Sequence, residues 1–134
     1  MTAGPVPATI DGPTFVALQV RDLDAAAAFC EQHLGLRRVA VSPPHAVVFD
    51  TKPTTFALRA PLPGVDLADT PRPGLGVVMW FRAEDAHALH GRLTEAGVEV
   101  LTPITESPFG PMFSFVGPEG YVLTAHGDVR ANTL

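Results

Sequence analysis

The sequence predicts an α+β fold made of two similar modules, each with a strand, a helix and further strands. Two apolar runs rich in β-branched and aromatic residues, 15–20 and 77–81, are typical of strands. Each run precedes acidic residues that can cap a helix, and each helical segment then ends at a glycine, Gly35 or Gly97. Because this order occurs only twice, at a spacing of about 60 residues, it indicates two modules rather than a solenoid.

The first module is expected at about 14–60, after a mobile arm at 1–12. Asp22 or Asp24 can cap its helix, which is rich in alanine. A Ser-Pro-Pro turn at 42–44 and a Thr-Lys-Pro connection at 51–53 separate the later strands, the last two of which we expect to form a hairpin. The expected elements are a strand at 14–20, a helix at 24–34, and strands at 37–41, 45–50 and 54–60.

A linker at 61–73, rich in proline and acidic residues, leads to the second module at about 74–127. Leu89 and Leu93 recur at helical spacing, which gives the second helix an apolar face. A Gly-Pro-Glu-Gly turn at 117–120 separates the last two strands, and we expect the tail at 127–134 to be frayed. The expected elements are a strand at 75–81, a helix at 84–96, a strand at 98–101, a loop at 102–111, and strands at 112–116 and 121–126.

Composition restricts the classes of function. The chain has 134 residues, 46% of them hydrophobic, which suits one domain spanning 1–134 with a real core. A net charge of −5 argues against a nucleic-acid partner, and no apolar run is long enough for a membrane span. Residues 1–13 hold three prolines and no basic residue, unlike a signal peptide. Cys30 is the only cysteine, so we expect a buried thiol and a reducing, cytoplasmic location.

Three motifs in this order resemble the vicinal oxygen chelate superfamily, which comprises glyoxalases, bleomycin-resistance proteins and extradiol dioxygenases. The resemblance covers about 14–127, and Gly117 stands where the family's closing turn often has aspartate. The motifs are Val16-x-Leu18-x-Val20-x-Asp22-Leu23-Asp24 with Phe29 and Leu34-Gly35-Leu36, then Trp80–Asp85 with Ala96-Gly97-Val98, then Phe113–Gly120.

The resemblance implies two βαβββ modules, each a curled, mixed, four-stranded sheet with a helix on its outer face, arranged around a cleft. Small members of the family usually pair, which also protects exposed sheet edges, so we expect a homodimer in which the arm at 1–13 can cross to the partner. Strand alternation then sorts the side chains. Val16, Leu18 and Val20 are expected to pack under the first helix, with Phe15 and Gln19 toward the cleft.

The resemblance also indicates where a metal site would lie and whether this sequence has ligands for it. Metal-dependent members carry His or Glu at four cleft positions, which match Phe15, Ala57, Val78 and Thr124 here. A divalent transition metal needs imidazole, carboxylate or thiolate ligands, and these four side chains provide none. We therefore expect no metal and no cofactor.

Without metal ligands, the cleft is apolar and aromatic with a few polar groups, as small-molecule sites usually are. Trp80 is either a cleft residue, which alternation favours, or a core residue. Phe109 is either a lid or a loop anchor, and His126 is either an orienting or a catalytic group. The expected ligand-binding residues are Phe15, Gln19, Thr55, Arg59, Val78, Trp80, Phe109, Met112, Ser114, Thr124 and His126, with Val122 beside them.

Metal-free members with aromatic clefts resemble the bleomycin-resistance type, which sequesters a drug without chemistry. We therefore expect a binding protein for an aromatic natural product or antibiotic that provides self-resistance, rather than an enzyme. One alternative is a glyoxalase- or dioxygenase-like lyase, isomerase or oxygenase with a displaced or absent metal site. Another is a structural or regulatory relative that binds no small ligand.

Overall fold

The computed structural model describes residue 4 and residues 8–129. Its first sheet has the order β1-β3-β2, with β1 parallel to β3 and β2 antiparallel to β3. The helix α1 lies between β1 and β2 in the chain. These elements are β1 (Phe15–Gln19), α1 (Leu23–Leu34), β2 (Ala46–Phe49) and β3 (Thr55–Arg59).

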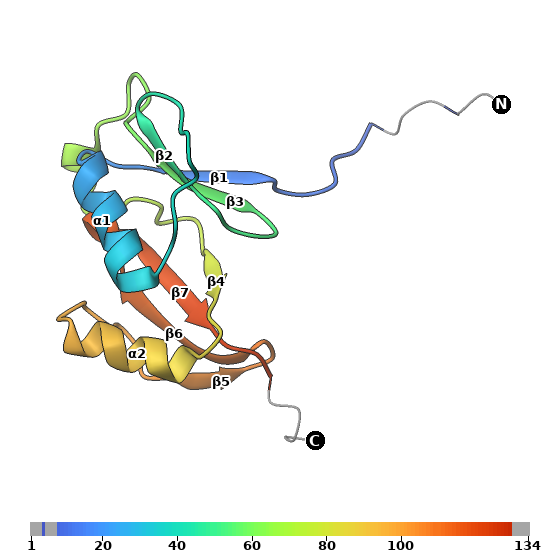
Figure 1. The fold of residues 1–134 in the computed structure, drawn as a ribbon, viewed down its shortest axis with the longest axis vertical. Coiled ribbons are helices and arrows are strands. Elements are labelled where there is room, and N and C mark those ends of the chain that lie inside the picture. The colour runs from blue at the N-terminus through green and yellow to red at the C-terminus, as the bar shows by residue number, and fades with distance from the viewer. Residues whose placement is uncertain (1–3, 5–7, 130–134) are drawn as a thin grey trace.

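The second sheet repeats this pairing. Its order is β4-β7-β6-β5, with β4 parallel to β7 and the other pairs antiparallel. Figure 1 shows the two sheets one above the other, both helices on the same side of them, and residues 8–14 running away from the body. The elements are β4 (Trp80–Arg82), α2 (Ala86–Glu95), β5 (Thr105–Ser107), β6 (Gly110–Val116) and β7 (Val122–His126), with short 3-10 turns η1 (Leu67–Asp69) and η2 (Pro118–Gly120). The α+β architecture with two mixed sheets is confirmed.

Both helices lie within two residues of the predicted bounds, since α1 begins one residue earlier than expected and α2 begins two residues later and ends one residue earlier. Asp22, and not Asp24, caps α1, and its Oδ1 accepts a hydrogen bond from the N–H of Ala25 at 3.0 Å. Asp85 caps α2 in the same way, through the N–H of Ala88. Gly35 and Gly97 follow the helices with φ of 71° and 81°, a left-handed conformation that side chains disfavour.

The core lies between the sheets and the helices. Leu18 of β1 and Val20, just after it, are buried with Cys30 of α1, and Phe113 and Phe115 of β6 belong to the same core. The modules meet where the rings of Phe56 and Phe81 form a T-shaped pair, with centroids 5.2 Å apart. The expected inward face of the first strand is therefore confirmed for Leu18 and Val20, while Val16 is half-buried.

Two expected strands, 37–41 and 98–101, are reduced to single bridges, Arg38–Phe49 and Val100–Phe115. The same cause operates in both modules. The hydroxyl of Ser42 accepts the N–H of Val48 at 3.0 Å, and that of Thr102 accepts the N–H of Ser114 at 2.9 Å. A continuing strand would need these two backbone N–H groups for its ladder of hydrogen bonds. Because the hydroxyls accept them instead, the pairing stops after one bridge. The first sheet consequently has three strands instead of the expected four.

Three other expectations need correction. The strand expected at 75–81 begins only at Trp80, because a turn closed by the N–H of Val77 and the carbonyl of Gly74 precedes it. The expected loop at 102–111 contains β5, whose flanking prolines lie outside the strand. The tail is held through residue 128, since Asp128 binds Arg82, while residues 130–134 lie outside the described part.

Residues 8–12 are exposed and form no helix or strand, whereas the remainder of the expected arm lies outside the described residues except for Gly4. In the part of the chain that the structure describes, neither helix has the length and apolar character needed to cross a bilayer.

Candidate functional site

Three rings form an aromatic cluster on the face of the second sheet that points away from the core. The centroids of Trp80 and Phe109 are 5.6 Å apart, those of Trp80 and His126 are 5.8 Å apart, and those of Phe109 and His126 are 6.4 Å apart. Phe109 and Trp80 meet edge to face, a favoured geometry for aromatic pairs. Phe109 is 62% exposed and Trp80 is 39% exposed, so both rings are partly accessible to a ligand.

Strand register explains why Trp80 lies there. It is paired with Thr124 of β7, and its neighbour Phe81 points to the opposite face and contacts Phe56. Alternation along a strand sends successive side chains to opposite faces, so Trp80 cannot share the core with Phe81. The sequence prediction that Trp80 lies outside the core therefore agrees with its position, whereas a ligand-binding role stays a prediction.

Polar groups accompany the rings on this face. The hydroxyls of Ser114 and Thr124 are 2.9 Å apart and share a hydrogen bond. The Nδ1 of His126 lies 2.8 Å from the carbonyl oxygen of Gly127. Because a carbonyl only accepts, Nδ1 donates, and in the neutral ring Nε2 is then an acceptor. Met112 is paired with His126 in the register of β6 and β7.

An ion pair stands at the end of β4 and β7. The guanidinium of Arg82 donates two hydrogen bonds to the carboxylate of Asp128, at 2.9 and 2.6 Å. These bonds hold the pKa of Asp128 below its usual value. The pair ties the end of β7 to β4 beside His126, so it positions that part of the cluster.

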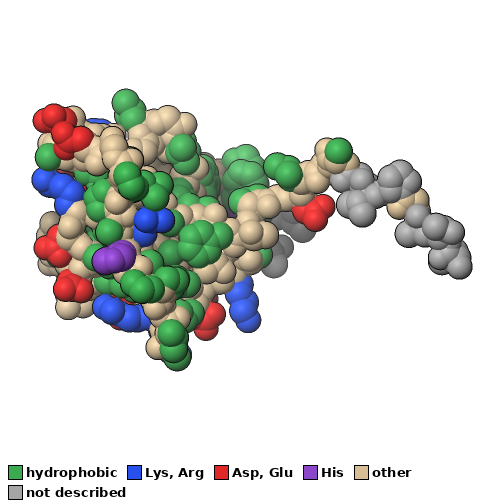
Figure 2. Space-filling model, turned by 90° about the horizontal axis from the view of Figure 1, so that it is seen from above, with side chains coloured by type: hydrophobic (Ala, Val, Ile, Leu, Met, Phe, Trp, Pro, Cys, Tyr) green, Lys and Arg blue, Asp and Glu red, His purple; other side chains and the backbone are tan. Residues whose placement is uncertain are grey.

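The first sheet carries the other predicted site residues. Phe15 is paired with Thr55 and Gln19 with Arg59, so the four share one face. The Oε1 of Gln19 accepts the N–H of Leu62, and the Nε of Arg59 donates to the carbonyl of Ala60. Figure 2, which looks down on the molecule from above the first sheet, shows hydrophobic side chains at the surface among charged ones.

The structure therefore divides the eleven predicted residues between two sheets. Phe15, Gln19, Thr55 and Arg59 lie on the first sheet, and Val78 is 74% exposed just before β4. The cluster on the second sheet brings together Trp80, Phe109, Met112, Ser114, Thr124 and His126.

An open cavity of about 520 Å³ lies beside this cluster, between the modules. Trp80 and His126 form part of its second-module wall, and the 51–54 turn forms part of its first-module wall. Its volume falls within the range of ligand sites, about 300–1,000 Å³. Sequence reasoning missed Thr51, Lys52 and Thr54 here, because it treated the 51–53 connection only as a turn.

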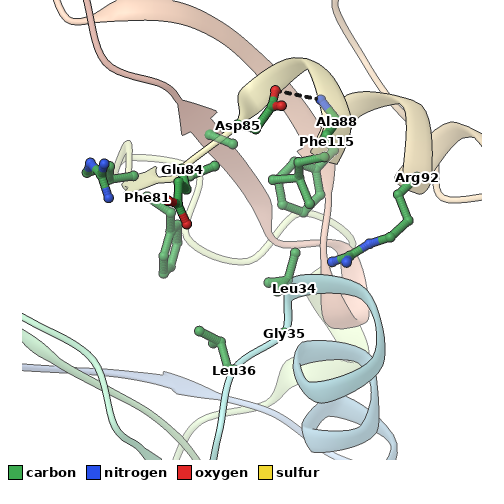
Figure 3. Close-up of a pocket in the computed structure, with 13 residues that line it drawn as sticks. Leu34, Gly35, Leu36, Phe81, Glu84, Asp85, Ala88, Arg92 and Phe115 are labelled. Carbon is green, nitrogen blue, oxygen red and sulfur yellow. Dashed lines mark hydrogen bonds between the residues drawn. The ribbon is translucent and has the colours of Figure 1, made fainter.

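A second cavity, of about 480 Å³, lies on the helix side of Phe81. Figure 3 shows Leu34 and Leu36 at the end of α1 beside it, with Arg92 reaching over from α2. Arg92 donates to the carbonyl of His33 at 2.7 Å, and Asp85 is engaged as the helix cap. Its ionisable lining residues carry both signs, and Arg82, Asp85 and Arg92 already have partners, so this cavity offers a charged ligand less than the one beside Trp80.

Residues 12–124 match the profile of the family described as the Glyoxalase/Bleomycin resistance protein/Dioxygenase superfamily. The match covers most of the chain. The chain belongs to this superfamily. It is the superfamily that the sequence motifs indicate, so that identification is confirmed.

Several solved structures share the fold. TnmS3, an antibiotic binding protein from Streptomyces sp. CB03234, superposes with a TM-score of 0.69 at 24% identity, over 91% of this chain and 99% of that one. The fosfomycin resistance protein FosX from Listeria monocytogenes superposes with a TM-score of 0.67 at 16% identity, over 94% and 100%. A glyoxalase/bleomycin resistance protein/dioxygenase from Nocardioides gives 0.66 at 22% identity, over 93% and 89%. No curated protein matches the sequence.

The sequence motifs predict that Phe15, Ala57, Val78 and Thr124 occupy the four positions that hold metal ligands in metal-dependent members. Ala57 is buried in the first sheet, and the hydroxyl of Thr124 is bonded to Ser114. Among the described residues, no group of three or more His, Cys, Asp or Glu side chains is placed to hold an ion. The donor set at these positions therefore does not fit a divalent transition metal.

Proposed function

We propose that this member of the superfamily is a metal-free binding protein that sequesters an aromatic natural product, such as an antibiotic, and so provides self-resistance. The observation that carries the proposal is the cluster of Trp80, Phe109 and His126 beside a cavity of about 520 Å³, which Trp80 and His126 line. Flat aromatic faces beside an open cavity suit stacking of a planar ligand. The structural likeness to the antibiotic binding protein TnmS3 is consistent with this function.

Binding without chemistry follows from the side chains available. The hydroxyls of Ser114 and Thr124 bond to each other, and His126 is held through Gly127, so these groups can orient a ligand by hydrogen bonds. Neither hydroxyl is bonded to a base, as an activated nucleophile would be. We assign His126 an orienting role.

We further propose that the protein acts as a cytoplasmic homodimer whose single domain comprises modules at about 14–60 and 74–127, with 61–73 as linker. Phe15 is 54% exposed, and Val78, Trp80 and Val122 also expose large apolar surfaces on the sheets or next to them. Apolar area of this extent supports an interaction surface. In such a dimer, the first sheet of one subunit would cover the second sheet of its partner. The site residues of the first sheet and those of the second sheet would then line one cleft.

The sole tryptophan makes the test direct. Isothermal titration against a panel of aromatic natural products, with Trp80 fluorescence as an independent signal, should identify ligands of the wild-type protein. Trp80→Ala should weaken binding by about 2 kcal/mol, some thirty-fold in dissociation constant, because it removes a stacking face and its buried apolar area. The fold should survive, because Trp80 lies outside the core.

Val41→Ala is the matched control, since Val41 is an exposed apolar residue away from the cluster. It should leave affinity unchanged. If Trp80→Ala instead melts far below the wild type while its folded fraction binds normally, Trp80 is structural and the proposed site is wrong. Conversion of a bound compound into a product would replace sequestration by catalysis.

A further inference from the structure

The ionisable residues that line the inter-module cavity are all basic or imidazole groups. Among the described residues at its wall they are Lys52, Arg82 and His126, and none is acidic. The whole chain, by contrast, has 14 acidic and 9 basic residues. A cavity of this sign in an acidic protein is complementary to a negatively charged ligand.

The two cations contribute differently. The guanidinium of Arg82 is already bonded twice to Asp128, which neutralises most of its charge. Lys52 is the only lysine of the chain and sits in the 51–54 turn at the mouth of the cavity. In the described residues its ammonium takes part in none of the ion pairs, which join Arg21, Arg38 and Arg82 to carboxylates. An ammonium group with three donors suits a carboxylate, sulfonate or ionised phenol.

The rest of the cavity is apolar. Phe56, Met79 and Phe81 line it, and Trp80 presents its ring from the second sheet. Thr51 and Thr54 line the cavity together with Lys52, but the hydroxyl of Thr51 donates to the carbonyl of Thr54 and that of Thr54 donates to the carbonyl of Pro13. The turn therefore has its hydroxyl protons engaged, which leaves Lys52 as its ionic donor toward the cavity.

We infer that this cavity takes an aromatic anion, whose rings lie against Trp80 and whose acidic group is received by Lys52. The inference rests on the proposed function and specifies its ligand class. Neutral rings of the same shape bind there more weakly. Added salt reduces the difference in affinity between the anion and the neutral ring, because it screens the partly exposed ammonium.

Two fluorescent probes with matched rings can test this. 1-Anilinonaphthalene-8-sulfonate is an aromatic anion, and N-phenyl-1-naphthylamine has the same ring system without the sulfonate. Wild-type protein should bind the anion about tenfold more tightly than the neutral probe at low salt, the order expected for one charge partly exposed to water. At 0.5 M salt, where the screening length falls to about 4 Å, this ratio should shrink toward one.

Lys52→Met retains most of the side-chain length and removes the charge, so it should lower affinity for the anion about tenfold and leave the neutral probe unchanged. Arg72→Met, which removes a charge from the exposed linker, is the matched control and should change neither affinity. Trp80→Ala should weaken both probes, because both stack on the indole.

The outcomes separate the two proposals. Equal affinity of both probes for wild type and Lys52→Met, with Trp80→Ala weakening both, would overturn the anion inference and leave the aromatic site intact. Equal losses of affinity for the anionic probe in Lys52→Met and Arg72→Met would show a general charge effect and would also overturn the anion inference. Failure of both probes to bind would overturn the inference and the proposed function together.

Discussion

Removal of the Glu119 carboxylate should strongly destabilise the fold, because this side chain joins the two modules. Its Oε1 accepts the backbone N–H of Arg21 at 2.7 Å, and its Oε2 accepts that of Asp22 at 2.8 Å. The guanidinium of Arg21 lies 3.7 Å away, and the Glu119 side chain is only 18% exposed. The closing turn of the second module thus holds the segment between β1 and α1 of the first.

The magnitude follows from these contacts. Hydrogen bonds to charged groups are worth about 1.5–3 kcal/mol each, so Glu119→Ala should cost about 3 kcal/mol of the free energy of unfolding. For a domain of this size, that corresponds to a fall of about 10 °C in melting temperature. Glu119→Gln keeps one acceptor oxygen and turns an amide N–H₂ toward the other donor. It should therefore lose at least half as much free energy of unfolding as Glu119→Ala. Glu119 has a φ of 55°, and neither substitution relieves that left-handed strain.

Denaturant and thermal unfolding of both variants, with Trp80 fluorescence and circular dichroism as probes, measure the loss. Glu106→Ala, which removes an exposed carboxylate from β5, is the control and should stay within about 0.5 kcal/mol of wild type. A similarly small change in Glu119→Ala would refute the reasoning, since it would mean that the two backbone donors are satisfied equally well without the carboxylate.

Three further predictions concern metal, assembly and the thiol. Elemental analysis after purification without chelators should find no stoichiometric Fe, Mn, Ni or Zn. About one ion per chain would contradict the prediction that the positions of Phe15, Ala57, Val78 and Thr124 leave the protein without a metal site. Light scattering at micromolar concentration should give the mass of a dimer, and a monomer mass would remove the proposed shared cleft. Burial raises the pKa of the Cys30 thiol to about 12, so the native protein should resist thiol reagents until it unfolds. Because the unfolded thiol ionises near its ordinary pKa of 9.0 while the native thiol stays protonated until about pH 12, stability should fall as pH rises from 9 toward 12, and by less in Cys30→Ala.

Local physical rules made much of the fold predictable from the sequence. Capping aspartates and following glycines placed both helices to within a few residues, because these residues satisfy orphan backbone groups near their own positions. Strand alternation separated Trp80 from Phe81, and Leu18 from Gln19, since a pleated strand sends neighbours to opposite faces. The superfamily followed from the order of motifs along the chain.

Strand lengths were not predictable in this way. Whether 37–41 and 98–101 continue as strands depends on donors of Val48 and Ser114, which the hydroxyls of Ser42 and Thr102 capture across the sheet. Each capture joins residues whose proximity arises only when the strands pair. The loop prediction at 102–111 failed similarly, since Pro103 and Pro108 flank β5 without interrupting it and Pro111 lies within β6.

Residue type and the alternation of side chains along strands identified the residues of the candidate site one at a time. Their grouping was decided by tertiary structure. Phe109 meets Trp80 because the β5–β6 turn folds over β7, and Lys52 shares a cavity with Trp80 because Phe56 and Phe81 pack the two modules together. Alternation is a property of neighbours in the chain, whereas a cavity is a property of surfaces that only the packed core brings face to face.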